Sequence, residues 1–132
     1  MRSKSLIVSN ILGTIYAIYL LWFFGGAVIE SGGLEFVKSY GAIFKFIGFS
    51  SASVNVFYVI ATLLIVHICT FTIGSLLGWI GYLDKKSGPA KFAGVLYLVG
   101  TICFPIYVFF GLPITIVGFV GAKNQKKINL AN

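Results

Sequence analysis

Charged side chains divide the chain into long apolar stretches. Three intervals, residues 5–29, 46–83 and 92–122, hold no Asp, Glu, Lys or Arg. Each is longer than the ~20 apolar residues with which an α-helix crosses a bilayer. The pattern predicts an all-α integral membrane protein with a single membrane domain over residues 1–132.

The third interval is too long for one straight span. As a helix, residues 92–122 would be ~46 Å long, against ~30 Å of hydrocarbon, which demands more than the usual 0–40° of tilt. We expect this segment to cross and return, with the break at Phe110–Pro113, where Gly111 can end one helix and Pro113 can start the next. The sequence thus predicts a four-helix transmembrane bundle with spans at 6–29, 53–82, 89–109 and 112–127.

A different pattern fills the segment between the first two spans, residues 34–49. At 3.6 residues per turn its charged residues share one face, and its apolar residues lie away from that face. The charged face consists of Glu35, Lys38, Ala42 and Lys45, and the apolar set of Phe36, Tyr40, Ile43 and Phe44. This favours an amphipathic helix in the membrane interface, with an irregular loop packed over the bundle as the alternative. The preceding Glu30–Gly33 predicts a turn.

Composition agrees with membrane insertion. The chain is 58% hydrophobic and only 10% charged, whereas soluble domains carry roughly 25% charged residues. The net charge of +7 comes from clusters at the ends of the spans: Arg2 and Lys4, then Lys85, Lys86 and Lys91, then Lys123, Lys126 and Lys127. This is the distribution of the positive-inside rule, so it indicates topology rather than nucleic-acid binding. We expect a bacterial cytoplasmic membrane protein, in contact with membrane lipids, with both termini cytoplasmic.

The last third of the chain carries a resemblance. DKKSGPAKFAGVLYLVGTI, an apolar gap, and GLPITIVGFVGAKNQKK are similar to the C-terminal half of certain small four-span bacterial membrane proteins. In those proteins a basic loop precedes an A-G-x-L span, and a glycine-containing final span ends in a lysine tail. The resemblance implies four spans and assigns no activity.

Small residues recur every four positions in the predicted spans. GSLLGWIG, residues 74–81, holds three glycines, although glycine costs a helix about 0.5–1 kcal/mol relative to alanine. Such spacing lets helix backbones approach closely in lipid, and we expect Gly78 to lie where two backbones nearly touch. The predicted helix-packing residues, all at cytoplasmic depth, are Ser9, Gly13, Gly74, Gly78, Gly81, Ala90, Gly94, Gly118 and Ala122.

Aromatic residues gather in the opposite, outer half of the predicted bundle. They are Trp22, Phe23, Phe24, Phe57, Tyr58, Phe104, Tyr107, Phe109 and Phe110. We expect them to form a filled plug or a partner surface. The alternative is an end that splays to admit a lipid tail.

His67 is the one ionisable residue well inside a predicted span, and ionisable groups at that depth are functional candidates. One interpretation is a proton-coupled or ligand-contacting group, since imidazole titrates near neutrality. The other is a neutral histidine bonded to a threonine, a tyrosine or a backbone carbonyl of a neighbouring span, and this structural role is favoured because no carboxylate accompanies it. Pro105, expected within the third span, frees the Thr101 carbonyl as a candidate partner.

No enzyme signature is present in the sequence: no nucleophile–base constellation, no paired carboxylates, no H-E-x-x-H and no phosphate-binding loop. We expect no cofactor or metal site, and we expect Cys69 and Cys103 to be free thiols at different depths. The leading hypothesis is a non-enzymatic accessory or regulatory subunit, or an immunity-type protein, that associates through its helices with a membrane partner or with itself. The alternative is an oligomeric transporter or pore for a small or hydrophobic solute that uses His67.

Overall fold

The computed structural model describes residues 1–30, 32, 34–48 and 50–132, and the described chain is helical almost throughout. The elements are α1 (Lys4–Leu20), a π-helical turn η1 (Leu21–Gly25), α2 (Gly26–Glu30), α3 (Leu34–Phe46), α4 (Ser51–Leu83), α5 (Ser87–Cys103), a 3₁₀ turn η2 (Pro105–Tyr107) and α6 (Val108–Ala131). The all-α prediction is confirmed for the described residues.

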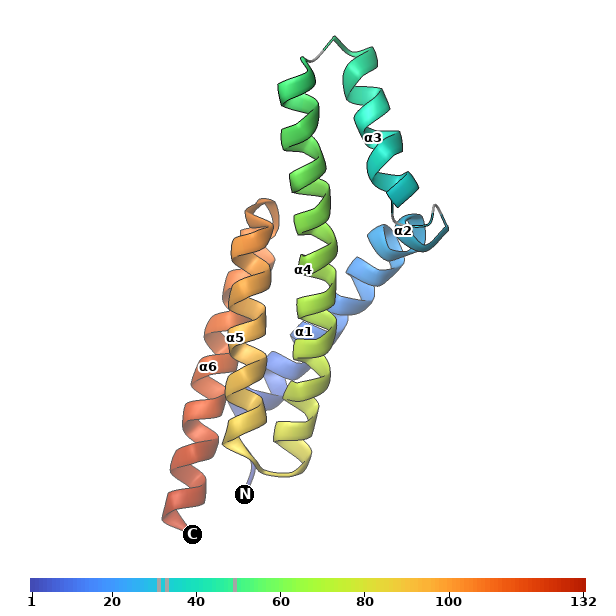
Figure 1. The fold of residues 1–132 in the computed structure, drawn as a ribbon. Coiled ribbons are helices and arrows are strands. Elements are labelled where there is room, and N and C mark those ends of the chain that lie inside the picture. The colour runs from blue at the N-terminus through green and yellow to red at the C-terminus, as the bar shows by residue number, and fades with distance from the viewer. Residues whose placement is uncertain (31, 33, 49) are drawn as a thin grey trace.

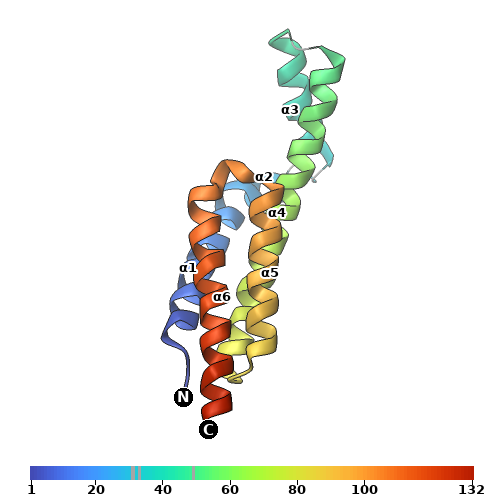
Figure 2. The ribbon, with the colours of Figure 1, turned by 90° about the vertical axis from the view of Figure 1, so that its left-hand side faces the viewer.

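The long helices pack side by side around a shared core. α5 lies between α4 and α6, and α1 crosses obliquely to contact both α4 and α6 (Figures 1 and 2). Both termini and the short α4–α5 loop lie at one end. Because the clusters of basic residues lie there too, we call it the basic end.

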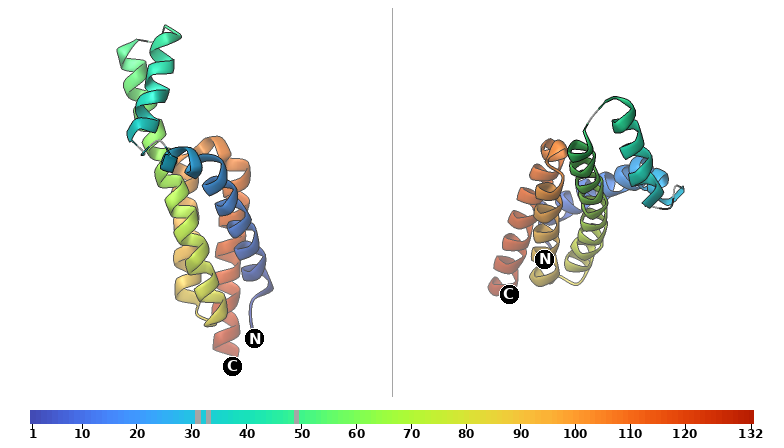
Figure 3. Two further views of the ribbon diagram at one scale, coloured as in Figure 1. Left: turned by 90° about the vertical axis from the view of Figure 1, so that its right-hand side faces the viewer. Right: turned by 45° about the horizontal axis from the view of Figure 1, so that its top comes forward.

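At the opposite end α4 continues well past the turn that joins α5 to α6. α3 packs against this extension (Figures 1 and 3). We call α3 together with residues 51–60 of α4 the arm.

In the described part of the chain, three helical stretches are long and apolar enough to cross a membrane: Lys4–Glu30, Tyr58–Leu83 and Pro105–Ala131. α5, with 17 residues, is ~25 Å long. α3 is a helix, so the irregular-loop alternative is wrong for residues 34–46. It runs alongside α4 (Figure 1), and its place in a membrane interface stays a prediction. Ser31 and Gly33 of the expected turn, and Phe49, lie outside the described residues, as do the side chains of Phe36, Tyr40, Phe44 and Phe57.

The break between α5 and α6 differs from the prediction. α5 ends at Cys103, and Phe104 is non-helical with φ −136° and ψ 76°, because the proline that follows disfavours the α conformation at the residue before it. Pro105 opens η2 and therefore lies outside α5, while Pro113 lies inside α6. The predicted break at Phe110–Pro113 is wrong, and the helices predicted at 89–109 and 112–127 are residues 87–103 and 108–131.

Most of the core is aromatic and aliphatic. One cluster of buried residues joins all the long helices: Tyr16, Leu20, Leu64, Ile68, Phe71, Ala93, Tyr97, Phe104 and Ile114. A smaller cluster of Leu6, Ala90 and Ala122 lies at the basic end. The two clusters set the helix register that positions the groups described next.

Candidate functional site

His67 lies halfway along α4 and is fully buried. Its Nδ1 is 2.6 Å from the Gly100 carbonyl oxygen of α5, and its Nε2 is 2.8 Å from the Tyr16 hydroxyl of α1. A carbonyl oxygen only accepts hydrogen bonds, so Nδ1 carries a hydrogen, and in the neutral tautomer Nε2 accepts from Tyr16. The imidazole therefore links three helices with both of its nitrogens satisfied.

These partners are of the kind that the structural interpretation expects, a tyrosine hydroxyl and a backbone carbonyl on neighbouring helices. The carbonyl is that of Gly100, one residue before Thr101. The Thr101 hydroxyl instead donates to the Tyr97 carbonyl at 2.7 Å. Pro105, outside α5, makes no kink beside His67. A functional role for His67 stays a prediction.

An aromatic cluster surrounds His67 and fills the adjacent end of the bundle. The His67 ring centroid lies 4.9 Å from that of Phe71 and 5.5 Å from that of Phe104. Tyr107 stacks on Phe104 at 5.8 Å and meets Phe24 edge-on at 6.0 Å. This inner part of the predicted outer aromatic set thus fills the bundle as a plug.

Four other members of that set, Trp22, Phe23, Phe109 and Phe110, are exposed; Tyr58 is half-buried. The four exposed residues lie on η1 and on the first turn of α6, so they surround the plug rather than belong to it.

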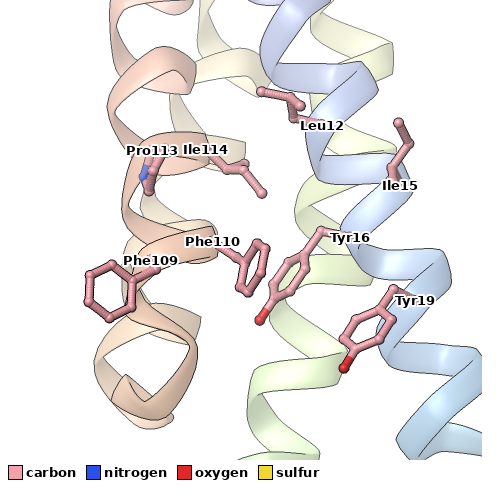
Figure 4. A pocket seen from close by; sticks show the side chains of 8 residues that line it. All are labelled: Leu12, Ile15, Tyr16, Tyr19, Phe109, Phe110, Pro113 and Ile114. Carbon is pink, nitrogen blue, oxygen red and sulfur yellow. The ribbon is translucent and has the colours of Figure 1, made fainter.

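An apolar groove of about 510 Å³ lies between α1 and α6, beside the His67 cluster. Its wall includes Tyr16, Tyr19, Phe110 and Ile114, whose side chains face one another across the groove (Figure 4). Tyr16 and Phe110 stack with centroids 6.0 Å apart and an interplanar angle of 15°. Because Tyr16 also bonds His67, one side chain connects the groove to the buried imidazole.

Two of the predicted packing glycines, Gly13 and Gly74, lie against the side chain of Tyr97 of α5. Its ring is buried, and a Cβ added at Gly74 of α4 would lie 2.8 Å from the ring. A Cβ at Gly13 of α1 would lie 2.5 Å from the Tyr97 hydroxyl oxygen. The glycines form a socket for one large side chain.

Gly78 does not lie where two backbones touch. A Cβ there would overlap the Oδ1 of Asn10, and the buried Asn10 amide donates to the Gly78 carbonyl at 2.9 Å. The glycine makes room for a polar side chain of α1. The expectation of backbone contact at Gly78 is therefore wrong.

Backbones do approach at two other glycines. A Cβ at Gly81 would lie 2.7 Å from the Ala90 nitrogen, where α4 meets α5. A Cβ at Gly121 would lie 2.7 Å from the Leu6 Cα, where α6 meets α1. Gly121 was missed by sequence reasoning because it does not follow the four-residue spacing of the predicted small residues. Its position three residues after Gly118, on a neighbouring part of the same helix face, was a usable signal.

The other predicted packing residues line the same contacts. Ser9 donates to the Ile114 carbonyl at 3.3 Å, Gly118 faces the Ser9 hydroxyl, and Gly94 faces the Phe119 ring. All the predicted helix-packing positions are buried. They lie inside the bundle, towards the basic end, with Ala122 in the Leu6 cluster.

The two cysteines are free thiols. The antiparallel register of α4 and α5, set by Gly81 beside Ala90 and His67 beside Gly100, places Cys69 opposite residues 98–102 of α5, before Cys103. Their different depths in a membrane stay a prediction.

Gln125, which sequence reasoning also missed, joins the segments of the basic end. It is fully buried, and its Oε1 accepts from the Ser3 backbone N–H at 2.9 Å. Its amide nitrogen donates to Asn129 at 2.9 Å, and Asn129 in turn donates to the Lys85 carbonyl at 2.8 Å. Gln125 lies seven residues after Gly118 and three after Ala122, so the helical period that predicts their burial was also the available signal for Gln125.

The chemistry available to this arrangement is packing and hydrogen bonding. No group of three or more His, Cys, Asp and Glu among the described residues is placed to hold a metal ion. No protein-family model, no curated protein and no solved structure matches this chain.

Proposed function

We propose that this chain is a small non-enzymatic membrane protein with four spans. In this proposal it works as an accessory or regulatory subunit, or an immunity-type protein, by holding a partner membrane protein against its arm. The observation that carries the proposal is the arm itself, an apolar helical extension that the rest of the described chain leaves uncovered.

The small-residue faces are unavailable for such an association. Gly13, Gly74 and Gly78 pack against Tyr97 and Asn10 of the same chain, so these faces build the bundle and cannot bind a partner without unfolding it. Association therefore needs another surface.

The arm offers that surface. Phe46 of α3 is 93% exposed, and Val56 and Val59 of α4 are 60% and 59% exposed. α4 has 33 residues and is ~50 Å long, which exceeds the ~30 Å of a hydrocarbon core. Even at the usual limit of 40° tilt α4 is longer than the hydrocarbon core, so part of its apolar surface extends beyond that core, where exposed apolar side chains favour an interaction site.

The topology part of the proposal places both termini in the cytoplasm and the arm outside. Single cysteines replace exposed residues in a background without Cys69 and Cys103. Those at Lys4, Lys86 and Leu130 should react with impermeant maleimide only from the cytoplasmic side, and that at Ser39 only from outside. Labelling of position 130 from the outside contradicts the four-span arrangement.

Site-specific photocrosslinking in native membranes tests the association. A photoreactive phenylalanine at Val56 or Val59 should yield one discrete adduct with another protein. The matched controls are Ile73 and Leu76, exposed positions on the same helix within the bundle, which should yield lipid adducts. Adducts with lipid alone at the arm positions, or with a second copy of this chain, overturn the partner proposal.

The apolar groove favours a second candidate function, an oligomeric transporter or pore for a small or hydrophobic solute. Tyr16 lines the groove and bonds His67, so a solute in the groove would reach the imidazole through one side chain. Flux of an apolar dye through liposomes containing the purified chain, abolished by His67→Ala, supports this candidate. Unchanged flux in the variant removes it.

A further inference from the structure

A second groove lies at the basic end, between the start of α5 and the C-terminal half of α6. Its volume is about 460 Å³, and three lysines line it: Lys91 of α5, and Lys123 and Lys126 of α6. The two α6 lysines are three residues apart, so they share a helix face. The groove therefore concentrates three cations from two helices around one space.

Among the described residues, neither salt bridge that the structure contains involves one of these lysines. The whole chain has three acidic residues, and Asp84, the one at this end, pairs with Lys86 at 3.4 Å. Glu35 pairs with Lys38 on α3, and Glu30 ends α2. The groove lysines are thus free to bind an external anion.

The start of α5 adds a second source of positive potential. Ser87 and Gly88 line the groove, and the first turn of α5 receives no side-chain cap from Lys86. Pro89 has no N–H, so the backbone N–H groups that this helix end offers to a phosphate or carboxylate are those of Ser87 and Gly88. This helix end therefore adds to the positive potential of the lysines that line the same groove.

The remaining wall of the groove is apolar. Phe119 and Ala122 line it, and the Phe119 ring is held against Gly94, where an added Cβ would lie 3.2 Å away. A ligand that fits both parts carries an anionic group at one end and a hydrocarbon segment beside it. An inorganic phosphate ion would contact only the lysines and the helix end, and not the apolar wall.

We propose that this groove binds the phosphate of an anionic phospholipid, with the adjoining acyl region against Phe119. The inference rests on the membrane location proposed above and is independent of any partner at the arm. Basic pockets between helices near the membrane surface recognise anionic headgroups, each lysine contributing about a fivefold gain in affinity. Three lysines correspond to about a hundredfold.

The test measures lipid binding to the purified chain in detergent, by native mass spectrometry and by thermal unfolding. Phosphatidylglycerol should bind and raise the melting temperature, and phosphatidylcholine should do neither. The triple variant Lys91→Gln, Lys123→Gln, Lys126→Gln should lose about a hundredfold in phosphatidylglycerol affinity. The matched control, Lys4→Gln, Lys85→Gln, Lys127→Gln, removes the same charge outside the groove and should lose no more than about fivefold.

Equal losses in the two triple variants overturn the proposal, because lipid binding would then depend on net charge alone. Stabilisation by inorganic phosphate to the same extent as by phosphatidylglycerol overturns the lipid part and leaves a phosphate site. A groove variant that fails to fold is replaced by Phe119→Leu, which keeps the charges. This variant should weaken phosphatidylglycerol binding and leave the response to phosphate unchanged, and unaltered lipid binding in it contradicts the assignment.

Discussion

The contact between α6 and α1 at Gly121 gives a quantitative test of the packing account. An alanine Cβ there would lie 2.7 Å from the Leu6 Cα, 2.8 Å from the Leu6 nitrogen and 3.0 Å from the Leu6 Cβ. Ordinary contacts begin at 3.4 Å, so the helices must separate by about 0.7 Å. The obstacle is backbone, which cannot rotate aside as a side chain can.

The expected magnitude follows from two opposing effects. Overpacking costs about 1–3 kcal/mol, and backbone contact places Gly121→Ala near the upper end. The intrinsic helix preference for alanine over glycine offsets about 1 kcal/mol of this cost. We therefore expect a net loss of about 2 kcal/mol in the free energy of unfolding, measured by reversible denaturation in mixed micelles.

Gly26→Ala is the matched control. Gly26 has helical dihedral angles of −56° and −52°, and an added Cβ there meets nothing within 4 Å. Only the propensity effect remains, so this variant should be more stable by about 0.5–1 kcal/mol. A Gly121→Ala variant as stable as the wild type or more stable refutes close backbone packing at this site.

Three further variants test the interior. His67→Leu removes both hydrogen bonds and should cost about 0.6–2 kcal/mol of unfolding free energy. His67→Gln keeps a donor and an acceptor and should cost less. A Gln variant that folds normally but is inactive in cells argues for a functional role. Tyr97→Phe removes the hydroxyl oxygen that an added Cβ at Gly13 would meet. A double-mutant cycle should therefore show Gly13→Ala better tolerated in the Tyr97→Phe background by about 0.5–3 kcal/mol, and additivity would contradict the socket. Gln125→Ala should cost about 1–3 kcal/mol, against less than about 0.5 kcal/mol for Lys127→Ala on the exposed surface.

The sequence was sufficient to predict that the small residues spaced by four are buried, because burial follows the local helical period. Gly74, Gly78 and Gly118 share a spacing of four, and each lies inside the bundle. What each glycine faces could not be predicted in this way. That depends on the register between helices, which brings Tyr97 beside Gly74 and Asn10 beside Gly78 and is set by the packing of the whole core.

The α5–α6 break shows the same limit. Gly111-Leu112-Pro113 and Phe104-Pro105 both carry turn signals, and the glycine shortly before Pro113 favoured the later one. In the structure Gly111 packs against the Thr101 side chain, so its small size serves a helix contact. Local chemistry does not distinguish a glycine that ends a helix from one that lets a helix approach.

The hydrogen bonds of α1 have a consequence for biosynthesis. Ser9 donates to a carbonyl 105 residues later, Asn10 to one 68 residues later, and the Ser3 N–H to a side chain 122 residues later. In lipid no water replaces a missing partner. α1 therefore completes its polar contacts only after α6 has left the ribosome, and the ring of helices closes after translation of the spans, with the first helix made among the last to dock.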